Sequence, residues 1–146
     1  MLFGLVALTV FIADRVSKGM IEANIASGTE INVVPRLLWF ANTHNSGAAF
    51  GVLPSAALVF TVFSVVVSGA IIYYVLSKPG NVYRDLMLGL ILGGTLGNGY
   101  DRLVHGTVTD FLALHWWPIF NVADASVSVG VVGLVLGQLL RRSSAA

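Results

Sequence analysis

The sequence predicts an all-α membrane protein, a bundle of four transmembrane helices that carries a small extramembrane β-platform. Hydrophobic residues make up 56% of the 146-residue chain and charged residues only 10%, whereas soluble domains carry roughly 25% charged residues. The mean hydropathy is +0.85. The apolar residues also gather in four runs, each near the length of about 20 residues that a spanning helix needs. Composition and patterning therefore agree on a membrane bundle.

We expect one polytopic membrane domain, residues 1–146, whose helices follow the four apolar runs. The predicted helices are at about residues 1–24, 56–76, 86–104 and 121–140. The first run has neither a basic leading region nor a small-residue cleavage site, so we interpret it as a helix and not as a signal peptide. The second, "AALVFTVFSVVVSGAIIYYVL", contains β-branched stretches, but its length and its lack of polar alternation favour a helix in lipid.

The three connections between these helices differ in character. The stretch "KPGNVYR", residues 78–84, is typical of a tight turn. The longer loop, about residues 27–54, contains "EINVV" and "LLWFANT", which resemble short strands and predict a small sheet on the membrane surface. The last connection lies in "VTDFLALHWWPIFNVAD", residues 108–124. We expect it to leave the third helix, cross the interface at its paired tryptophans and re-enter the membrane after Pro118.

The basic residues predict the orientation of the bundle. Lys78, Arg84, Arg141 and Arg142 lie at one end of the helix map. The positive-inside rule then places both termini in the cytoplasm and the two longer connections on the outer side.

Composition also limits the kinds of site that the chain can hold. It has no cysteine, which excludes disulfides, thiolate metal sites and a cysteine nucleophile. The three histidines show no close ligand spacing, so we expect no metal and no cofactor. A net charge of +1 gives no reason to expect a nucleic-acid partner.

Charged side chains within membrane segments cost about 2.5–3.5 kcal/mol each on insertion scales, so each is expected to have a partner or a task. Asp14 and Lys18 have the spacing of a helix salt bridge, and an Asp101–Arg102 ion pair is the structural interpretation of that pair. On the helix map the polar residues fall toward the outward half and can converge on one pocket. They are Asp14, Lys18, Asn45, Asn98, Asp101, Arg102, Asp110, Asn121 and Asp124.

Asp110 and Asp124 are distinct because no basic residue lies between them. One continuous helix would hold their carboxylates about 21 Å apart. Pro118 interrupts the stretch and Gly106 precedes it, so the two acids can meet on adjacent helix ends. Close carboxylates share a proton, since both cannot ionise cheaply. Such a pair can hydrolyse a peptide: the ionised acid takes a proton from water, and its partner assists the oxyanion and the leaving amine. The residues leave open which acid is the base.

Four stretches of the chain match a known family: "DRVSK" in the first helix, "NSGAAFG" after the first loop, "GGTLGNGYDRLVHGTVTDF" in and beyond the third helix, and "FNVAD" at the fourth. On these motifs, which cover most of the chain, it resembles the bacterial lipoprotein signal peptidases (signal peptidase II), aspartyl peptidases of the inner membrane. Thr109 stands where a valine is common in that family, and Ala125 where a serine is common. Both lie beside the acids.

The resemblance implies the roles of individual residues. Asp110 and Asp124 would be the catalytic pair, and Asn45 and Arg102 would help to hold the substrate backbone. The other positions of the family pattern, with supporting or binding roles, are Asp14, Lys18, Gly47, Asn98, Asp101 and Asn121.

The resemblance also implies the substrate, the inhibitor and the location. The substrate would be a diacylglyceryl-modified prolipoprotein, cut just before the lipidated cysteine, and globomycin-type cyclic peptides would inhibit. The active site and the β-platform would face the periplasm, among membrane lipids.

Two alternatives remain open from the residues themselves. A small proton-coupled transporter would use buried acids as a relay, but it would need them spread across the bilayer depth. A non-enzymatic assembly factor would use buried polar groups only for helix association. The small residues Gly89, Gly93, Gly94 and Gly97 of the third helix permit close helix packing or a ligand groove, and we expect packing for most of them.

Overall fold

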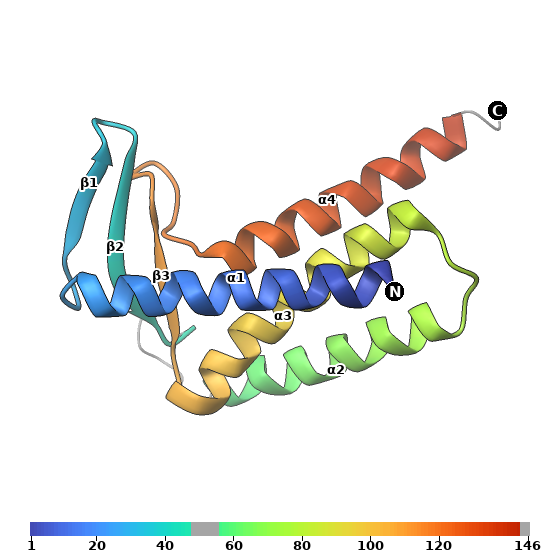
Figure 1. The fold of residues 1–146 in the computed structure, drawn as a ribbon, viewed down its shortest axis with the longest axis horizontal. Helices are drawn as coiled ribbons and strands as arrows, with labels where there is room; N and C mark the ends of the chain where they lie inside the picture. The colour runs from blue at the N-terminus through green and yellow to red at the C-terminus, as the bar shows by residue number, and fades with distance from the viewer. Residues whose placement is uncertain (48–55, 144–146) are drawn as a thin grey trace.

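The protein is a helical bundle with a three-stranded sheet at one end (Figure 1). The computed structural model describes residues 1–47 and 56–143. Its elements are α1 (Leu2–Asn24), β1 (Glu30–Val34), β2 (Leu38–Asn45), α2 (Ala56–Leu76), α3 (Val82–His105), β3 (Val108–Ala113) and α4 (Val122–Ser143). The turn from α2 to α3 and the C-terminal end of α4 lie at the end opposite the sheet (Figure 1).

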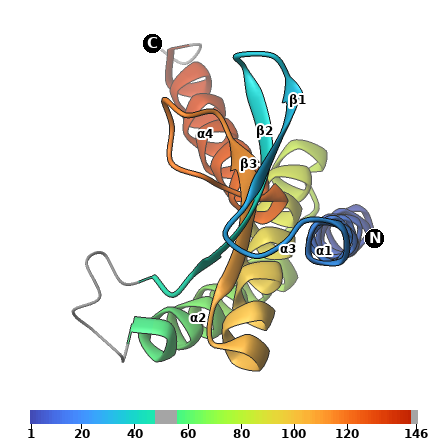
Figure 2. The same ribbon diagram turned by 90° about the vertical axis from the view of Figure 1, so that its left-hand side faces the viewer.

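Helix α3 is the centre of the bundle, with α1, α2 and α4 packed around it (Figure 2). Among the described residues no Cα atom of α1 lies within 8 Å of one of α2, and the two helices flank α3 with a groove between them. The groove measures about 660 Å³ and is lined mainly by apolar side chains of the three helices.

The predicted glycines of α3 serve packing. A Cβ on Gly93 would lie 2.5 Å from the carbonyl oxygen of Ala7 on α1, and one on Gly94 would collide with the carbonyl oxygen of Ala123 on α4. These close approaches require the absence of a side chain, since real Cβ atoms do not come so near. The groove between α1 and α2 is lined by a different glycine, Gly99.

The sheet contains the two predicted strands and one that was not predicted. It is antiparallel in the order β1-β2-β3, and Thr43 of β2 lies opposite Asp110 of β3. The expectation that Asp110 would sit at a helix end is therefore wrong. The segment Val108–Ala113 lacks strict polar alternation because it is buried almost throughout, and its pairing partner is far away in sequence.

A small apolar cluster joins the sheet to the bundle. Ile21 and Ile25 at the end of α1 pack with Phe111 of β3. The ring of Phe40 on β2 meets Phe111 edge to face, with centroids 6.3 Å apart. The cluster fixes β3, and with it Asp110, against the end of α1.

The start of α3 differs from the prediction, whereas α4 begins one residue after the predicted residue 121. Helix α3 starts at Val82 and not near residue 86, because Asn81 caps it by accepting a hydrogen bond from the backbone N–H of Arg84 at 2.9 Å. Helix α4 starts at Val122, directly after Asn121, and continues beyond the predicted residue 140 to Ser143. Capping side chains, and not hydrophobicity, set both starts.

Two helices in the described part of the chain are long and apolar enough to cross a membrane, at Ala57–Leu76 and Val122–Arg141. The expectation of four such segments is met only in part. Helices α1 and α3 fall short on composition because they carry charged residues, of which Asp14, Lys18 and Asp101 are buried against neighbouring helices.

Candidate active site

The structure brings Asp110 and Asp124 together through one residue, Asn121. Asp110 lies on β3 and Asp124 in the first turn of α4. The side-chain amide of Asn121 donates to Asp110 Oδ1 at 2.7 Å, and its backbone N–H donates to Asp124 Oδ2 at 3.2 Å. Asp110 is 4% exposed and Asp124 is partly exposed. Strand β3 and the first turn of α4 thus bring both carboxylates within hydrogen-bond distance of Asn121.

Asn121 can do this because it also caps α4. Its side-chain Oδ1 accepts the backbone N–H of Asp124 at 2.9 Å, while the Asp124 carboxylate accepts the backbone N–H of Asn121. This reciprocal arrangement has the geometry of a capping box. Because Oδ1 is occupied by a backbone donor, the amide nitrogen must face the acceptors, and Asp110 is one of them.

Asn98 orients the other carboxylate from α3. Its amide nitrogen donates to Asp124 Oδ1 at 2.7 Å, and its carbonyl oxygen accepts from Lys18 Nζ at 2.9 Å and from the Asn121 amide at 3.1 Å. Lysine can only donate, so it determines which way the Asn98 amide points. The predicted residues of three helices therefore form one connected network.

Asn45 supports Asp110 from the end of β2. Its amide nitrogen donates to Asp110 Oδ2 at 3.0 Å, while its oxygen accepts the backbone N–H of Gly47 at 2.8 Å. Gly47 has φ 74, a conformation that favours glycine, and a Cβ there would lie 2.8 Å from the Phe60 ring. Gly47 thus contributes by orienting Asn45, within a turn that a larger residue would disturb.

A second group of charges lies deeper in the bundle. Lys18 Nζ is 2.7 Å from both Asp14 Oδ2 and Asp101 Oδ2, and Asp101 also pairs with Arg15. The predicted Asp14–Lys18 bridge is confirmed. Asp101 has its ion-pair partners on α1 and not in Arg102, because neighbouring residues on a helix point in different directions.

This ion-pair group also holds the start of α4. Asp14 Oδ1 accepts the backbone N–H of Ala123 at 3.0 Å, which satisfies one of the free donors at that helix end. Asp14 is fully buried, and a Cβ on Gly97 would lie 2.6 Å from its Oδ2 atom. The position of Asp124 therefore depends on Asp14, through one turn of helix.

Arg102 stands apart from these pairs. Its guanidinium lies over the Phe60 ring, 5.0 Å from the centroid, and Nη1 donates to the Asn98 carbonyl at 3.5 Å. Its Nε is buried without a hydrogen-bond partner among the described residues. Arg102 interacts electrostatically with Asp110 and Asp124, but in the described part of the chain it forms no ion pair with either. A cation with spare donors therefore lies beside the two acids.

The surroundings of Asp110 favour its protonated form. Burial raises the pKa of Asp110, and the nearby charge of Asp124 raises it further. Hydrogen bonds from Asn45 and Asn121, and the charge of Lys18, lower this pKa but do not cancel the rise. The net direction fits two carboxylates that hold one proton between them.

Two residues of this region, Arg15 and Glu22, were given no role in the prediction from the sequence. Arg15 is the second partner of Asp101, and its place beside Asp14 in "DRVSK" was the available signal. Thr109 Oγ1 donates to Glu22 Oε1 at 2.6 Å, a bond that a valine at this position could not make. That bond ties β3 to α1 next to Asp110.

Within the described ranges, no group of three or more His, Cys, Asp or Glu could hold a metal ion.

Comparisons with known proteins identify the family to which the chain belongs. The sequence profile of a family described as signal peptidase (SPase) II matches residues 6–140. The lipoprotein signal peptidase of Pseudomonas aeruginosa is 35% identical, with 95% of this chain and 88% of the relative aligned. The Listeria monocytogenes enzyme of the same name is 40% identical, over 90% of this chain and 89% of its own. A solved bacterial membrane enzyme superposes with a TM-score of 0.88 at 30% identity, covering 96% of this chain and 88% of the other.

Proposed function

Since the chain belongs to the signal peptidase II family and so removes signal peptides from lipoproteins, we infer that Asp110 and Asp124 are its catalytic pair. The observation that carries this inference is Asn121, which donates to one acid through its side chain and to the other through its backbone. No cation is ion-paired with either acid among the described residues, so a proton can pass between them and a bound substrate.

The proposed reaction needs no cofactor. The ionised acid removes a proton from a water molecule as the water attacks the scissile carbonyl. The protonated acid gives its proton to the carbonyl oxygen, which forms a gem-diol. As the C–N bond breaks, the other acid passes the proton it took from water to the leaving amine, and the first acid regains its proton from the gem-diol. Asn45 and the spare donors of Arg102 lie beside the acids and would hold the peptide backbone of the substrate. Asn98 and Asn121 keep the carboxylates in position, and Asp14, Lys18 and Asp101 hold the helices that carry them.

We place all four helices across the bilayer. At 1.5 Å per residue the helices are about 31–36 Å long, enough for a hydrocarbon core of about 30 Å. Asp14 and Lys18 of α1 face inward, and the outer face of this helix is an apolar stripe. The exposed residues of that stripe are Leu5, Leu8, Ile12, Val16 and Met20.

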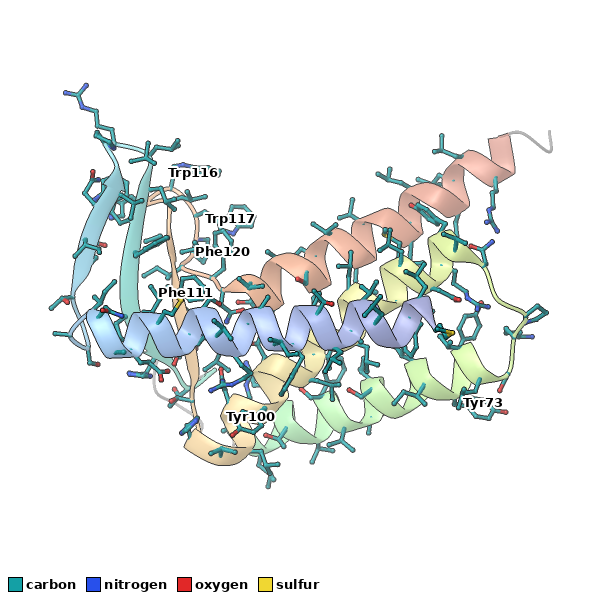
Figure 3. All side chains as sticks on the ribbon, in the orientation of Figure 1. Tyr73, Tyr100, Phe111, Trp116, Trp117 and Phe120 are labelled. Carbon is teal, nitrogen blue, oxygen red and sulfur yellow. The ribbon has the colours of Figure 1, made fainter. Side chains whose placement is uncertain are left out.

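Aromatic residues mark both ends of the proposed span. Trp116 and Trp117 project from the loop beside the sheet and are 72% and 58% exposed, while Tyr73 lies at the opposite end of the bundle (Figure 3). Such belts are typical of the two membrane interfaces. With both termini in the cytoplasm of a bacterial cell, the sheet and the acid pair lie at the periplasmic face of the inner membrane.

We propose a diacylglyceryl-modified prolipoprotein as the substrate, cut just before the lipidated cysteine. The apolar groove between α1 and α2 is open to hydrocarbon and reaches Leu103 near the sheet end, so acyl chains or an apolar signal helix can approach the acids from within the bilayer. The transporter alternative is not supported. The buried acids lie at one end of the bundle, and the relatives are peptidases.

Purified protein in detergent tests the proposal with two precursor peptides of the same sequence, one with a diacylglyceryl group on its cysteine and one without. We expect a single cut before the cysteine of the lipidated peptide, inhibited by globomycin, and little cleavage of the plain peptide. Equal cleavage of both would contradict the lipid requirement, and cleavage of neither would contradict the proposed substrate.

A further inference from the structure

A second pocket lies at the end of the bundle opposite the acid pair. It measures about 600 Å³ and is bounded by the α2–α3 turn and the C-terminal half of α4. Figure 1 shows these segments at the end of the molecule away from the sheet. None of the residues assigned above to catalysis or substrate binding lines this pocket.

The rim of this basic pocket carries uncompensated positive charge. Lys78, Arg84 and Arg141 line it, and only one acidic residue, Asp85, lies close by. Asp85 is committed to Arg84, with Oδ1 2.6 Å from Nη2 and 2.9 Å from Nε. Lys78 and Arg141 are exposed, and neither has an ion-pair partner in the part of the chain that the structure describes. Lys78 and Arg141 therefore line the same pocket without an ion-pair partner among the described residues.

The floor of the basic pocket is apolar. Leu88 and Leu134 line it, together with the rings of Tyr74 and Tyr83. The Tyr83 hydroxyl donates to the carbonyl of Gly133, which directs its polar atom toward α4 and leaves the ring as a wall. A pocket with cations at its rim and hydrocarbon beneath matches a ligand that joins an anion to an apolar chain.

We propose that the basic pocket binds an anionic phospholipid of the surrounding membrane, with its phosphate at Lys78 and Arg141 and an acyl chain against Leu134. The proposal rests on the membrane-spanning arrangement inferred above and not on the catalytic pair. Basic pockets between helices at the cytoplasmic face suit anionic headgroups, since each lysine or arginine there contributes about a five-fold gain in affinity. A free phosphate ion would use the rim but leave the apolar floor uncovered.

The test measures lipid binding by protein in a neutral detergent, with native mass spectrometry for bound lipid and thermal unfolding for stabilisation. The probes are dioleoyl phosphatidylglycerol, dioleoyl phosphatidylcholine and inorganic phosphate at matched concentrations. We expect only phosphatidylglycerol to be retained and to raise the melting temperature. Lys78→Gln and Arg141→Gln should each weaken its binding about five-fold, and the double variant about 25-fold.

Arg36→Gln is the matched control, because Arg36 is an exposed cation in the β1–β2 turn at the other end of the molecule. If Arg36→Gln weakened phosphatidylglycerol binding as much, the effect would depend on the net charge of the protein and not on the pocket, and the proposal would be overturned. Equal binding of phosphatidylcholine, or an unchanged double variant, would also overturn it, and an equal response to inorganic phosphate would show a site for the free ion. The test measures lipid binding without measuring cleavage, so its result is independent of whether the proposed catalytic pair is correct.

Discussion

Two groups of carboxylates lie close together in this protein, and they are held in different ways. Asp14 and Asp101 are paired with Lys18, whereas Asp110 and Asp124 accept hydrogen bonds from asparagine amides. A carboxylate paired with a buried cation is fixed in place by that pair, because losing either charge leaves the other uncompensated. A carboxylate held by neutral donors can gain or lose a proton without breaking an ion pair. The first group is suited to structure and the second to proton transfer.

The largest expected effect of this difference is on cleavage. Asp110→Asn and Asp124→Asn should each reduce turnover of the lipidated peptide about 10³-fold or more, because an amide can neither take nor give the proton. Both variants should still fold, as each amide keeps the size of the acid it replaces. Cleavage assays and thermal unfolding in detergent measure the two outcomes. Asp85→Asn, at the far end of α3, is the control and should keep its activity. Full turnover by either first variant would remove that acid from the pair.

Removing the cation of the ion-pair group should lower the stability of the protein. Lys18→Met leaves Asp14 without an ion-pair partner and Asp101 with only Arg15, so the free energy of unfolding should fall by about 3–5 kcal/mol. Lys78→Met removes an exposed lysine and should change the stability little. Unfolding in a denaturing detergent compares the variants. If Lys18→Met kept normal stability but could not cleave the lipidated peptide, the ion-pair group would belong to catalysis. The proposed difference between the two groups of carboxylates would then be wrong.

A smaller effect tests the packing that presses Asp14 against α3. Gly97→Ala places a methyl group 2.6 Å from Asp14 Oδ2 and should cost about 1–3 kcal/mol of stability through overpacking. Gly19→Ala makes the same change where nothing lies within 4 Å, and it should not destabilise the helix. Thermal unfolding of both variants gives the difference. Equal stabilities would mean that the helices move apart at no cost.

The smallest expected effect is on the pH profile. A pair that works with one shared proton loses activity as pH rises through the pKa at which that proton leaves. Burial raises the pKa of Asp110, so this loss should occur above the range of an ordinary aspartate. The bond from Asn45 lowers that pKa, so Asn45→Ala should move the alkaline limb to higher pH. Turnover measured across pH follows the limb, and a shift to lower pH would contradict the proposed role of Asn45.

Much of the fold could be predicted because the solvent imposes it. A backbone in hydrocarbon must satisfy its own hydrogen bonds, so long apolar runs become helices. The first two strands were also predictable, since "EINVV" and "LLWFANT" have strand composition. The strand around Asp110 was not, because it is buried on both faces and pairs with a segment some 65 residues earlier.

In the candidate site, too, some features could be predicted from the sequence and others could not. The sequence alone was enough to propose which residues react, because a carboxylate in an apolar chain is costly and no lysine or arginine lies between Asp110 and Asp124. It also determined the local Asp14–Lys18 pair, which needs only one helix turn. That Asn121 contacts both acids and that Arg15 pairs with Asp101 could be seen only in the folded chain. These contacts join segments far apart in the chain, and their geometry follows from how the helices and the sheet pack and not from spacing along one element.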